Sequence, residues 1–288
     1  MTALAAEFPA WEANPDVWLV VGLLTAAYVI AVVRLGPTHA PDPQRPVTGA
    51  QMASFGLGVF ATWLAADWPL HELAENSLYS VHMVQHLTFT LVATPLILMG
   101  TPAWMLRALV GGGRLLHIVR WCARFLPALL IYNVVLVLLH WPAVVDLTLR
   151  NGFAHFVAHV VVFVSALVVW LPVLSPLPEI PRLAPPMRML YLFLQSVVPT
   201  IPASFLTFGD TPLYGYYKGV DQLFGLSTVE DQRIAGLIMK VGAGFLLWTI
   251  IAVLFFRWYS DEEASSQHER RLRATRDRPV PQVGATHS

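Results

Sequence analysis

The sequence predicts an all-α protein, a polytopic helical bundle that crosses a membrane about seven times. Three observations indicate this class. Of the 288 residues, 56% are hydrophobic and only 12% are charged, a composition outside the usual range of soluble globular chains. Apolar runs close to the ~20 residues that one bilayer crossing requires recur along the chain. The arginines gather after alternate runs, as in loops on one side of a membrane.

Seven apolar runs are candidates for these crossings. They cover residues 17–33, 50–66, 79–100, 125–141, 153–173, 189–208 and 234–257. The second run is the least apolar, and its small residues Gly56 and Gly58 favour close helix packing over lipid contact. Pro95 in the third run, and Pro199 and Pro202 in the sixth, predict kinks whose freed carbonyl groups need other partners.

The domain organisation follows from the same runs. Residues 1–16 form an acidic segment without a basic leader, which we expect to stay outside the membrane. Residues 17–258 are the predicted seven-helix transmembrane domain. Residues 259–288 are polar and charged, and a disordered cytoplasmic tail is expected there. Because the arginines follow the first, third, fifth and seventh runs, we predict the N-terminus outside and the C-terminus in the cytoplasm.

The composition also excludes several classes of site. The single cysteine, Cys122, cannot form an intrachain disulfide or a paired-cysteine metal site. No basic, aromatic-interleaved surface is present, so no nucleic-acid partner is expected. The segment HELAE at 71–75 is not the HExxH motif of zinc peptidases, because position 75 is glutamate. Any metal ligands must therefore be histidine, methionine or carboxylate side chains.

Two pairs of histidines dominate the candidate site. His82 and His86 lie one helical turn apart in the third run, and His155 and His159 repeat this spacing in the fifth. Ionisable side chains inside a membrane-length helix usually face a bundle interior or a wet cavity, and they tend to be functional. The predicted orientation places both pairs in the outer half, where four imidazoles can form a cage.

Further residues are expected to complete this site. His71 and His140 fall at the same outer level and could cap the cage, and Met83 could add a soft thioether ligand. Imidazole suits zinc, copper, iron and nickel, and thioether adds a preference for Cu⁺. A histidine that binds a metal usually hydrogen-bonds a partner through its other ring nitrogen. We predict that Asp231, Gln232 and Glu72 are these partners. The histidine pattern also fits a haem site, a proton path or a polar network between helices.

Lys240 is the other unusual residue. It lies well inside the last run, about two turns beyond the acidic residues that open it. A lysine so deep is expected to be buried and to need a carboxylate or carbonyl partner.

The ordered motifs resemble a known family. The run WPLHELAENSLYSVHMVQHLTFTLVATPLILMGTPAW at 68–104 is similar to the signature of the multi-spanning, caa3-type CtaG family of cytochrome c oxidase assembly factors. HWP at 140–142, HFVAH at 155–159 and EDQRIAGLIM at 230–239 match its other recurrent segments. The resemblance covers roughly residues 50–257, and Lys240 departs from it, since an aromatic residue is expected after GLIM.

The resemblance implies a chaperone of the bacterial plasma (inner) membrane that assists assembly of the haem-copper oxidase, plausibly by handling copper. Its partners would be the lipid bilayer and cytochrome c oxidase subunits. The motif histidines and the acidic motif fall on the candidate residues named above. The leading hypothesis is copper binding at the outward-facing histidine cluster and delivery to the oxidase, without a catalysed reaction. A haem-binding redox protein, a copper permease and a membrane metalloenzyme using Glu72 or Asp231 as a base are the alternatives.

Overall fold

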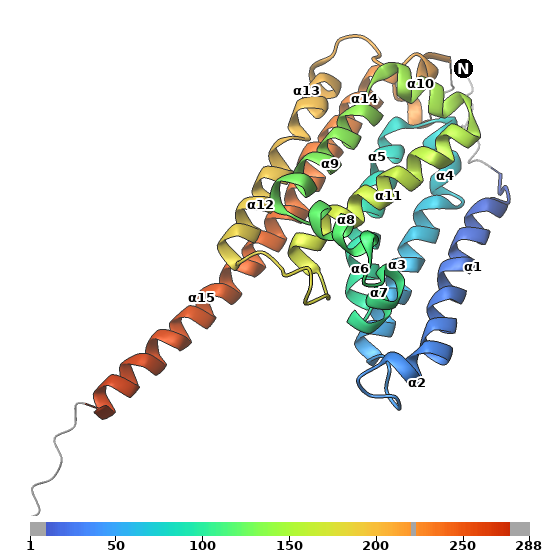
Figure 1. Cartoon of the computed structure of the whole chain (residues 1–288). Coiled ribbons are helices and arrows are strands. Elements are labelled where there is room, and N and C mark those ends of the chain that lie inside the picture. Colours follow the sequence, from blue (N-terminus) through green and yellow to red (C-terminus); the bar gives the residue numbers. More distant parts are fainter. Residues whose placement is uncertain (1–9, 220–222, 277–288) are drawn as a thin grey trace, which may run out of the picture.

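The computed structural model describes residues 10–219 and 223–276, with side chains to residue 270, and no strand occurs in these ranges. The helices run up and down between two ends of one bundle (Figure 1). One end carries α4 (Leu70–Asn76) and α10 (Pro142–Arg150), and we call it the α4 end. The opposite end carries α7 (Ala103–Val110) and α8 (Arg114–Cys122), and we call it the α7 end. The predicted all-α class is confirmed.

Helices occupy each predicted crossing, and three of them contain a π-helical stretch. The segments are α1 (Pro15–Ile30), a π-helical stretch (Ala31–Leu35), α2 (Gly36–His39), α3 (Gly49–Ala66), α5 (Tyr79–Leu87), a second π-helical stretch (Thr88–Ala93), α6 (Thr94–Gly100), α9 (Phe125–Leu139), α11 (Gly152–Leu174), α12 (Pro185–Val197), α13 (Thr200–Phe208), α14 (Thr228–Leu237), a third π-helical stretch (Ile238–Gly242) and α15 (Ala243–Arg276).

Five helical segments among the described residues are long and apolar enough to cross a bilayer. They are Pro15–His39, Tyr79–Gly100, Gly152–Leu174, Pro185–Phe208 and Thr228–Arg270. The pair α8 and α9, bent by 80°, raises the number to six if it counts as one crossing. Helix α3 is not among them, because its Gly- and Ala-rich sequence is less apolar. The number seven and the orientation therefore stay predictions.

Helix α3 packs closely against α6 through glycines. A Cβ atom at Gly58 would lie 2.7 Å from a side-chain carbon of Ile97 and 2.9 Å from the carbonyl oxygen of Ala93. At Gly100, a Cβ atom would meet the backbone of Phe55. Gly56, in contrast, has no atom within 4 Å of such a Cβ. The predicted use of small residues for helix packing holds for Gly58, and Gly56 lies on the open face.

The backbone around Pro95 is irregular. Proline has no N–H, so Pro95 leaves carbonyl groups of the preceding turn without a helical donor. The π-helical stretch Thr88–Ala93 directly precedes it, and the indole N–H of Trp170 donates to the carbonyl oxygen of Thr90 at 2.7 Å. The hydroxyl of Thr94 donates to the carbonyl oxygen of Phe89 at 2.7 Å. Side chains thus satisfy the backbone that the predicted kink exposes.

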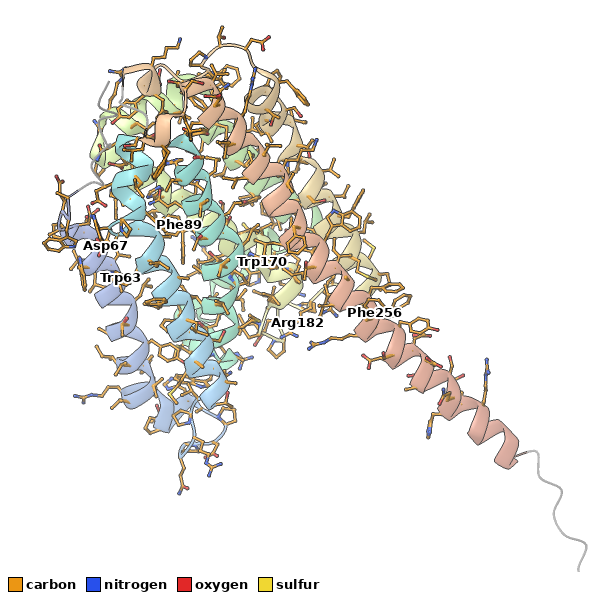
Figure 2. All side chains as sticks on the ribbon, turned by 180° about the vertical axis from the view of Figure 1, so that it is seen from behind. Trp63, Asp67, Phe89, Trp170, Arg182 and Phe256 are labelled. Atoms are coloured by element: carbon orange, nitrogen blue, oxygen red, sulfur yellow. The ribbon has the colours of Figure 1, made fainter. Side chains whose placement is uncertain are left out.

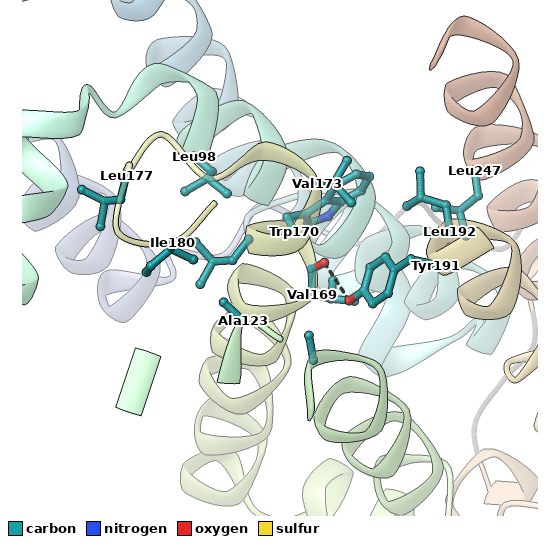
Figure 3. Packing of buried hydrophobic residues seen from close by; sticks show 12 residues of the cluster. Leu98, Ala123, Val169, Trp170, Val173, Leu177, Ile180, Tyr191, Leu192 and Leu247 are labelled. Atoms are coloured by element: carbon teal, nitrogen blue, oxygen red, sulfur yellow. Dashed lines mark hydrogen bonds between the residues drawn. The ribbon is translucent and has the colours of Figure 1, made fainter. Parts of the chain in front are cut away.

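The α7 half of the bundle has an apolar core. Figure 3 shows it between α11, α12 and α15, with Trp170, Tyr191, Leu192 and Leu247 among its labelled residues. Tyr191 is fully buried, and its hydroxyl donates to the carbonyl oxygen of Val169 at 2.9 Å. The view from behind in Figure 2 shows Trp170 inside the bundle. This core holds the α7 ends of the long helices together.

The C-terminal segment differs from the expected disordered tail. Helix α15 continues past the bundle to Arg276 (Figure 1), and residues 277–288 lie outside the described residues. Residues 261–270 of this extension are almost all polar or charged and all of them are exposed, so this part is a solvated single helix. The amide of Gln267 donates to Glu263 at 3.4 Å, one turn away, which is the local pairing that supports such a helix.

Lys240 lies on the exposed face of the third π-helical stretch, and its predicted burial is wrong. The packed face of α14 and its continuation consists of Gln232, Ala235, Gly236 and Met239. Adjacent helical positions are separated by about 100° around the axis, so the burial of Met239 turns Lys240 away from the bundle interior. The hydropathy of a segment does not specify which face of the helix packs against the bundle.

Candidate metal centre

The histidine pair of α5 is held in place by a capped helix start. One carboxylate oxygen of Asp231 accepts the backbone N–H of Tyr79 at 2.6 Å, and the other accepts that of Ser80 at 3.1 Å. These N–H groups have no partner within the helix, so the carboxylate stabilises its first turn. Asp231 therefore anchors α5 to α14, one turn before His82, and its bonds go to the backbone rather than to an imidazole.

The two histidine pairs face each other between α5 and α11. We call the four side chains His82, His86, His155 and His159 the histidine cluster. Ring centroids lie 4.4 Å apart within the α5 pair and 4.2 Å apart within the α11 pair. Between the helices, the rings of His86 and His159 are 5.3 Å apart and those of His82 and His155 are 6.0 Å apart. Among the described residues, the only three ligand atoms that lie within 4.8 Å of one another belong to His71, Glu75 and His155, so the four rings would have to move closer to share one ion.

An enclosed cavity of about 20 Å³ lies among these rings, and His140 also lines it. His140 ends α9, and its Nδ1 lies 2.7 Å from the carbonyl oxygen of Leu136. A carbonyl oxygen only accepts, so Nδ1 carries the proton and Nε2 keeps its lone pair. The backbone carbonyl thus fixes the tautomer of His140. Metal-binding histidines are commonly fixed in the same way, by an acceptor at the ring nitrogen that does not bind the metal.

Several ring nitrogens in this cavity have no hydrogen-bond partner among the described residues. They are Nδ1 of His82 and Nε2 of His86, His140, His155 and His159. Leaving a buried polar group unsatisfied costs about 1–3 kcal/mol. A cluster of such nitrogens around one small cavity is an arrangement that a positively charged ion would satisfy.

Met83 adds a thioether to the cavity wall. Its side chain is buried and lines the enclosed cavity beside His82 and His86. The predicted position of Met83 near one pair is thus observed, and its role as a ligand stays a prediction. Imidazole with thioether is a donor set that copper accepts.

A roof of buried tyrosines, Tyr79, Tyr214 and Tyr217, covers the cavity at the α4 end. Tyr79 stacks on His82 with centroids 5.7 Å apart, and its hydroxyl donates to that of Tyr214 at 3.2 Å. The hydroxyl of Tyr214 donates in turn to the carbonyl oxygen of His140, also at 3.2 Å. Burial raises the pKa of Tyr214 to about 12. The roof therefore stays neutral and donating at physiological pH.

A carboxylate joins the cluster at one side, and the sequence analysis did not select it. Glu75 on α4 has its Oε1 3.0 Å from Nε2 of His155 and 3.5 Å from Nε2 of His71. The approach to His155 lacks hydrogen-bond geometry despite its short distance. The i,i+4 spacing of His71 and Glu75 on one short helix was the available signal. The segment that contains both residues was compared only with the zinc-peptidase motif, which it does not match.

The expected orienting residues lie elsewhere. The side chain of Gln232 accepts the backbone N–H of Leu213 at 2.6 Å and so holds the loop before α14. Glu72 is buried and accepts the side-chain amide of Asn14 at 3.0 Å, which fastens the segment before α1. Neither contact involves the histidine cluster. The structure thus gathers the predicted histidines and Met83 and uses Asp231, Gln232 and Glu72 to brace the surrounding helices.

The size of the cavity limits what the cluster can hold. About 20 Å³ accommodates roughly one water-sized particle. A single metal ion fits this space, and a haem macrocycle does not. The donor set and the size of the cavity therefore agree with one ion.

Fold and site together define a polytopic helical membrane protein with a buried histidine cluster near one end. The model of the family described as cytochrome c oxidase caa3 assembly factor (Caa3_CtaG) matches residues 26–261, so the chain belongs to this family. The resemblance seen in the sequence motifs is confirmed. No curated protein and no solved structure matches the chain. Family membership indicates a role in oxidase assembly, in association with the oxidase, rather than catalysis.

Proposed function

We propose that this protein binds copper as cargo at the histidine cluster and delivers it to an oxidase subunit during assembly. The observation that carries the proposal is the set of unpartnered ring nitrogens on histidines that line one small cavity. Family membership supplies the process, because the family assembles an oxidase. The residues that would hold the ion are the histidine cluster, with His140 and Met83 as additional donors.

The same observation disfavours a purely structural role. In a polar network between helices, each imidazole would donate from one nitrogen and accept at the other. Here the described residues leave five ring nitrogens without partners around a space too small for extra side chains. A proton path would likewise need hydrogen-bonded neighbours at these nitrogens. A bound cation satisfies all of them together, and imidazole with thioether favours copper among the common metals.

Delivery is favoured over transport through the protein. Below the cluster, the core of the α7 half is apolar, and its described polar side chains are amides and hydroxyls rather than metal ligands. The one group of histidine and carboxylate ligands within 4.8 Å of one another among the described residues, His71, Glu75 and His155, does not lie there. An ion held in the cluster would therefore leave by exchange onto a partner's ligands on the same half of the bundle. No bond of a substrate is made or broken in this step.

Copper retention by the purified protein tests the proposal. We expect wild-type protein, loaded with copper and desalted in detergent, to retain about one equivalent, and the His82→Ala/His159→Ala variant to retain little. Mutation of residues that hydrogen-bond metal ligands typically weakens binding 10–100-fold. Removing two ligands themselves should weaken it more, by about 1000-fold. The matched control is His39→Ala/His117→Ala, which removes two exposed histidines at the α7 end.

The same variants should be compared in cells that make the oxidase. The cluster variant should lower the copper content and activity of the oxidase, and the control should leave both unchanged. Full copper retention by the cluster variant would show that these residues are not the copper ligands. A Soret band in the purified protein would instead favour the haem-binding alternative.

A further inference from the structure

We infer that His71, Glu75 and His155 form a separate loading site, where a metal ion first binds before it moves to the histidine cluster. This inference rests on the proposed function, because it assigns the route by which the cluster is filled. It adds a carboxylate ligand, Glu75, and places the point of capture on the side of the bundle rather than at its end.

The three side chains have the geometry of a metal site. One ligand atom from each lies within 4.8 Å of the other two. The carboxylate of Glu75 lies between the two imidazoles, at 3.0 Å and 3.5 Å from their Nε2 atoms. Two histidines and one carboxylate bind divalent metals such as zinc, with remaining positions open to water. Such an incomplete ligand set suits brief capture.

The loading site opens to a groove at the side of the bundle. A groove of about 370 Å³ runs between α1 and α11, and His71, Glu75 and His155 lie along it with Asp16. The side chain of Glu75 is 31% exposed and that of His71 is 18% exposed, whereas that of His155 is only 8% exposed. Exposure thus falls from the groove towards the cluster.

The tyrosine roof closes the alternative route from the α4 end. Tyr79 and Tyr217 are almost fully buried, and the hydroxyl of Tyr217 donates to the carbonyl oxygen of Ala74 at 2.7 Å. An ion approaching from that end would have to break these bonds. The groove offers a path in which the first ligands are already exposed.

The two sites share His155, which makes stepwise transfer possible. His155 and His159 line both the groove and the enclosed cavity. An ion bound by Glu75, His71 and His155 can gain His159, one turn along α11, and then the α5 pair as it releases Glu75 and His71. Each step replaces one metal–ligand bond by another, with no change in oxidation state.

Charge favours capture at the loading site, and the number of nitrogen donors favours retention in the histidine cluster. The carboxylates of Glu75 and Asp16 attract cations to the groove, while the cluster itself contributes only neutral donors. The cluster offers more nitrogens and excludes water, so it holds copper more firmly than the exposed set. The loading site therefore governs the rate of uptake, and the cluster governs the amount retained.

The rate of Cu²⁺ uptake separates these two roles. We expect Glu75→Gln to slow copper-induced quenching of tryptophan fluorescence about tenfold in stopped flow, with the copper retained after desalting unchanged. Glu75→Asp keeps the charge and should recover part of the rate. The matched control, Asp210→Asn, removes an exposed carboxylate that pairs with Arg233 and should load at the wild-type rate.

A second measurement examines the loading site alone. At equilibrium with Cu²⁺, the His82→Ala/His159→Ala variant should give an electron paramagnetic resonance spectrum of copper bound by two nitrogens and oxygen. Adding Glu75→Gln should weaken this binding about tenfold. If Glu75→Gln takes up copper at the wild-type rate and retains all of it, the loading site is wrong and the proposed function still stands. A wild-type protein that retains no copper would overturn the proposed function itself.

Discussion

The two halves of the bundle treat their buried polar side chains in opposite ways. In the α7 half, Trp170 and Tyr191 each donate to a carbonyl oxygen, at 2.7 Å and 2.9 Å. In the α4 half, five histidines keep a ring nitrogen without a partner among the described residues. The first arrangement stabilises the fold. The second leaves it with unsatisfied donors or acceptors, which is the expected state of a site whose ligand completes it.

The difference lies in what each half must do. A helix pair inside a membrane gains stability from close packing and from satisfied polar groups, as around Trp170 and the Pro95 kink. A cargo site must bind and then release its ion, so its side chains cannot be locked to one another. Stability from one half therefore offsets the cost of the other. This contrast makes separable predictions for changes in each half.

The largest effect on stability is expected in the α7 core. Trp170→Ala removes a large buried side chain and leaves the carbonyl oxygen of Thr90 without its donor. We expect the free energy of unfolding to fall by about 3–5 kcal/mol. Thermal unfolding in detergent measures this change. Copper retention by the folded fraction should match the wild type, and a loss of retention would show that the two halves are coupled.

Changes in the histidine cluster should alter the stability gained from copper and leave the metal-free stability nearly unchanged. Copper at 100 times its dissociation constant should raise the stability of wild-type protein by about 2.7 kcal/mol, because only the folded state binds it. The His82→Ala/His159→Ala variant should lose this gain while its metal-free stability changes little. Melting curves with and without copper give both values. A large drop in metal-free stability would mean that the histidines are structural.

The close contact of α3 with α6 offers a third comparison. Gly58→Ala places a Cβ atom against Ile97 and the Ala93 carbonyl and should cost about 1–3 kcal/mol. Gly56→Ala, two residues away on the open face, is the matched control and should be neutral or slightly stabilising. Equal effects of the two changes on the melting temperature would contradict the observed packing face.

A surface ion pair at the α7 end should have a smaller, pH-dependent effect. The hydrogen bonds from Arg107 to Glu179, each 2.9 Å long, hold the pKa of that carboxyl below its usual value of 4.5. Its contribution to stability is therefore present above pH 4.5 and is lost as the pH falls through the lowered pKa. Melting temperatures of wild type and Glu179→Gln should differ slightly at pH 7 and converge towards pH 3. A difference in melting temperature that persists at pH 3 would show that it does not come from the ion pair of Arg107 and Glu179.

The smallest effect on copper is expected from Lys240. Its side chain lies on the exposed face of its helix, with Met239 directed inwards instead. Lys240→Leu should therefore leave the copper affinity of the histidine cluster unchanged. Isothermal titration of both proteins is the measurement. A clear rise in affinity would indicate that the cation lies close enough to repel the bound ion.

The sequence by itself determined the helical class, the apolar lengths and the i,i+4 spacing within each histidine pair. These features follow from the composition and from a 3.6-residue period, which are local properties. They were enough to expect that His82 and His86 share one helix face, as His155 and His159 do. The motif order was enough to indicate the family.

Only the tertiary structure decided which faces meet. It brought Glu75 on α4 against His155 on α11, although 80 positions separate them in the chain. It directed the carboxylate of Asp231 to the backbone of α5, and it turned Lys240 away from the interior. These outcomes depend on the rotation and pairing of helices, which single-helix periodicity leaves open. Packing between distant segments settles them, because each helix can bury only one face against its neighbours.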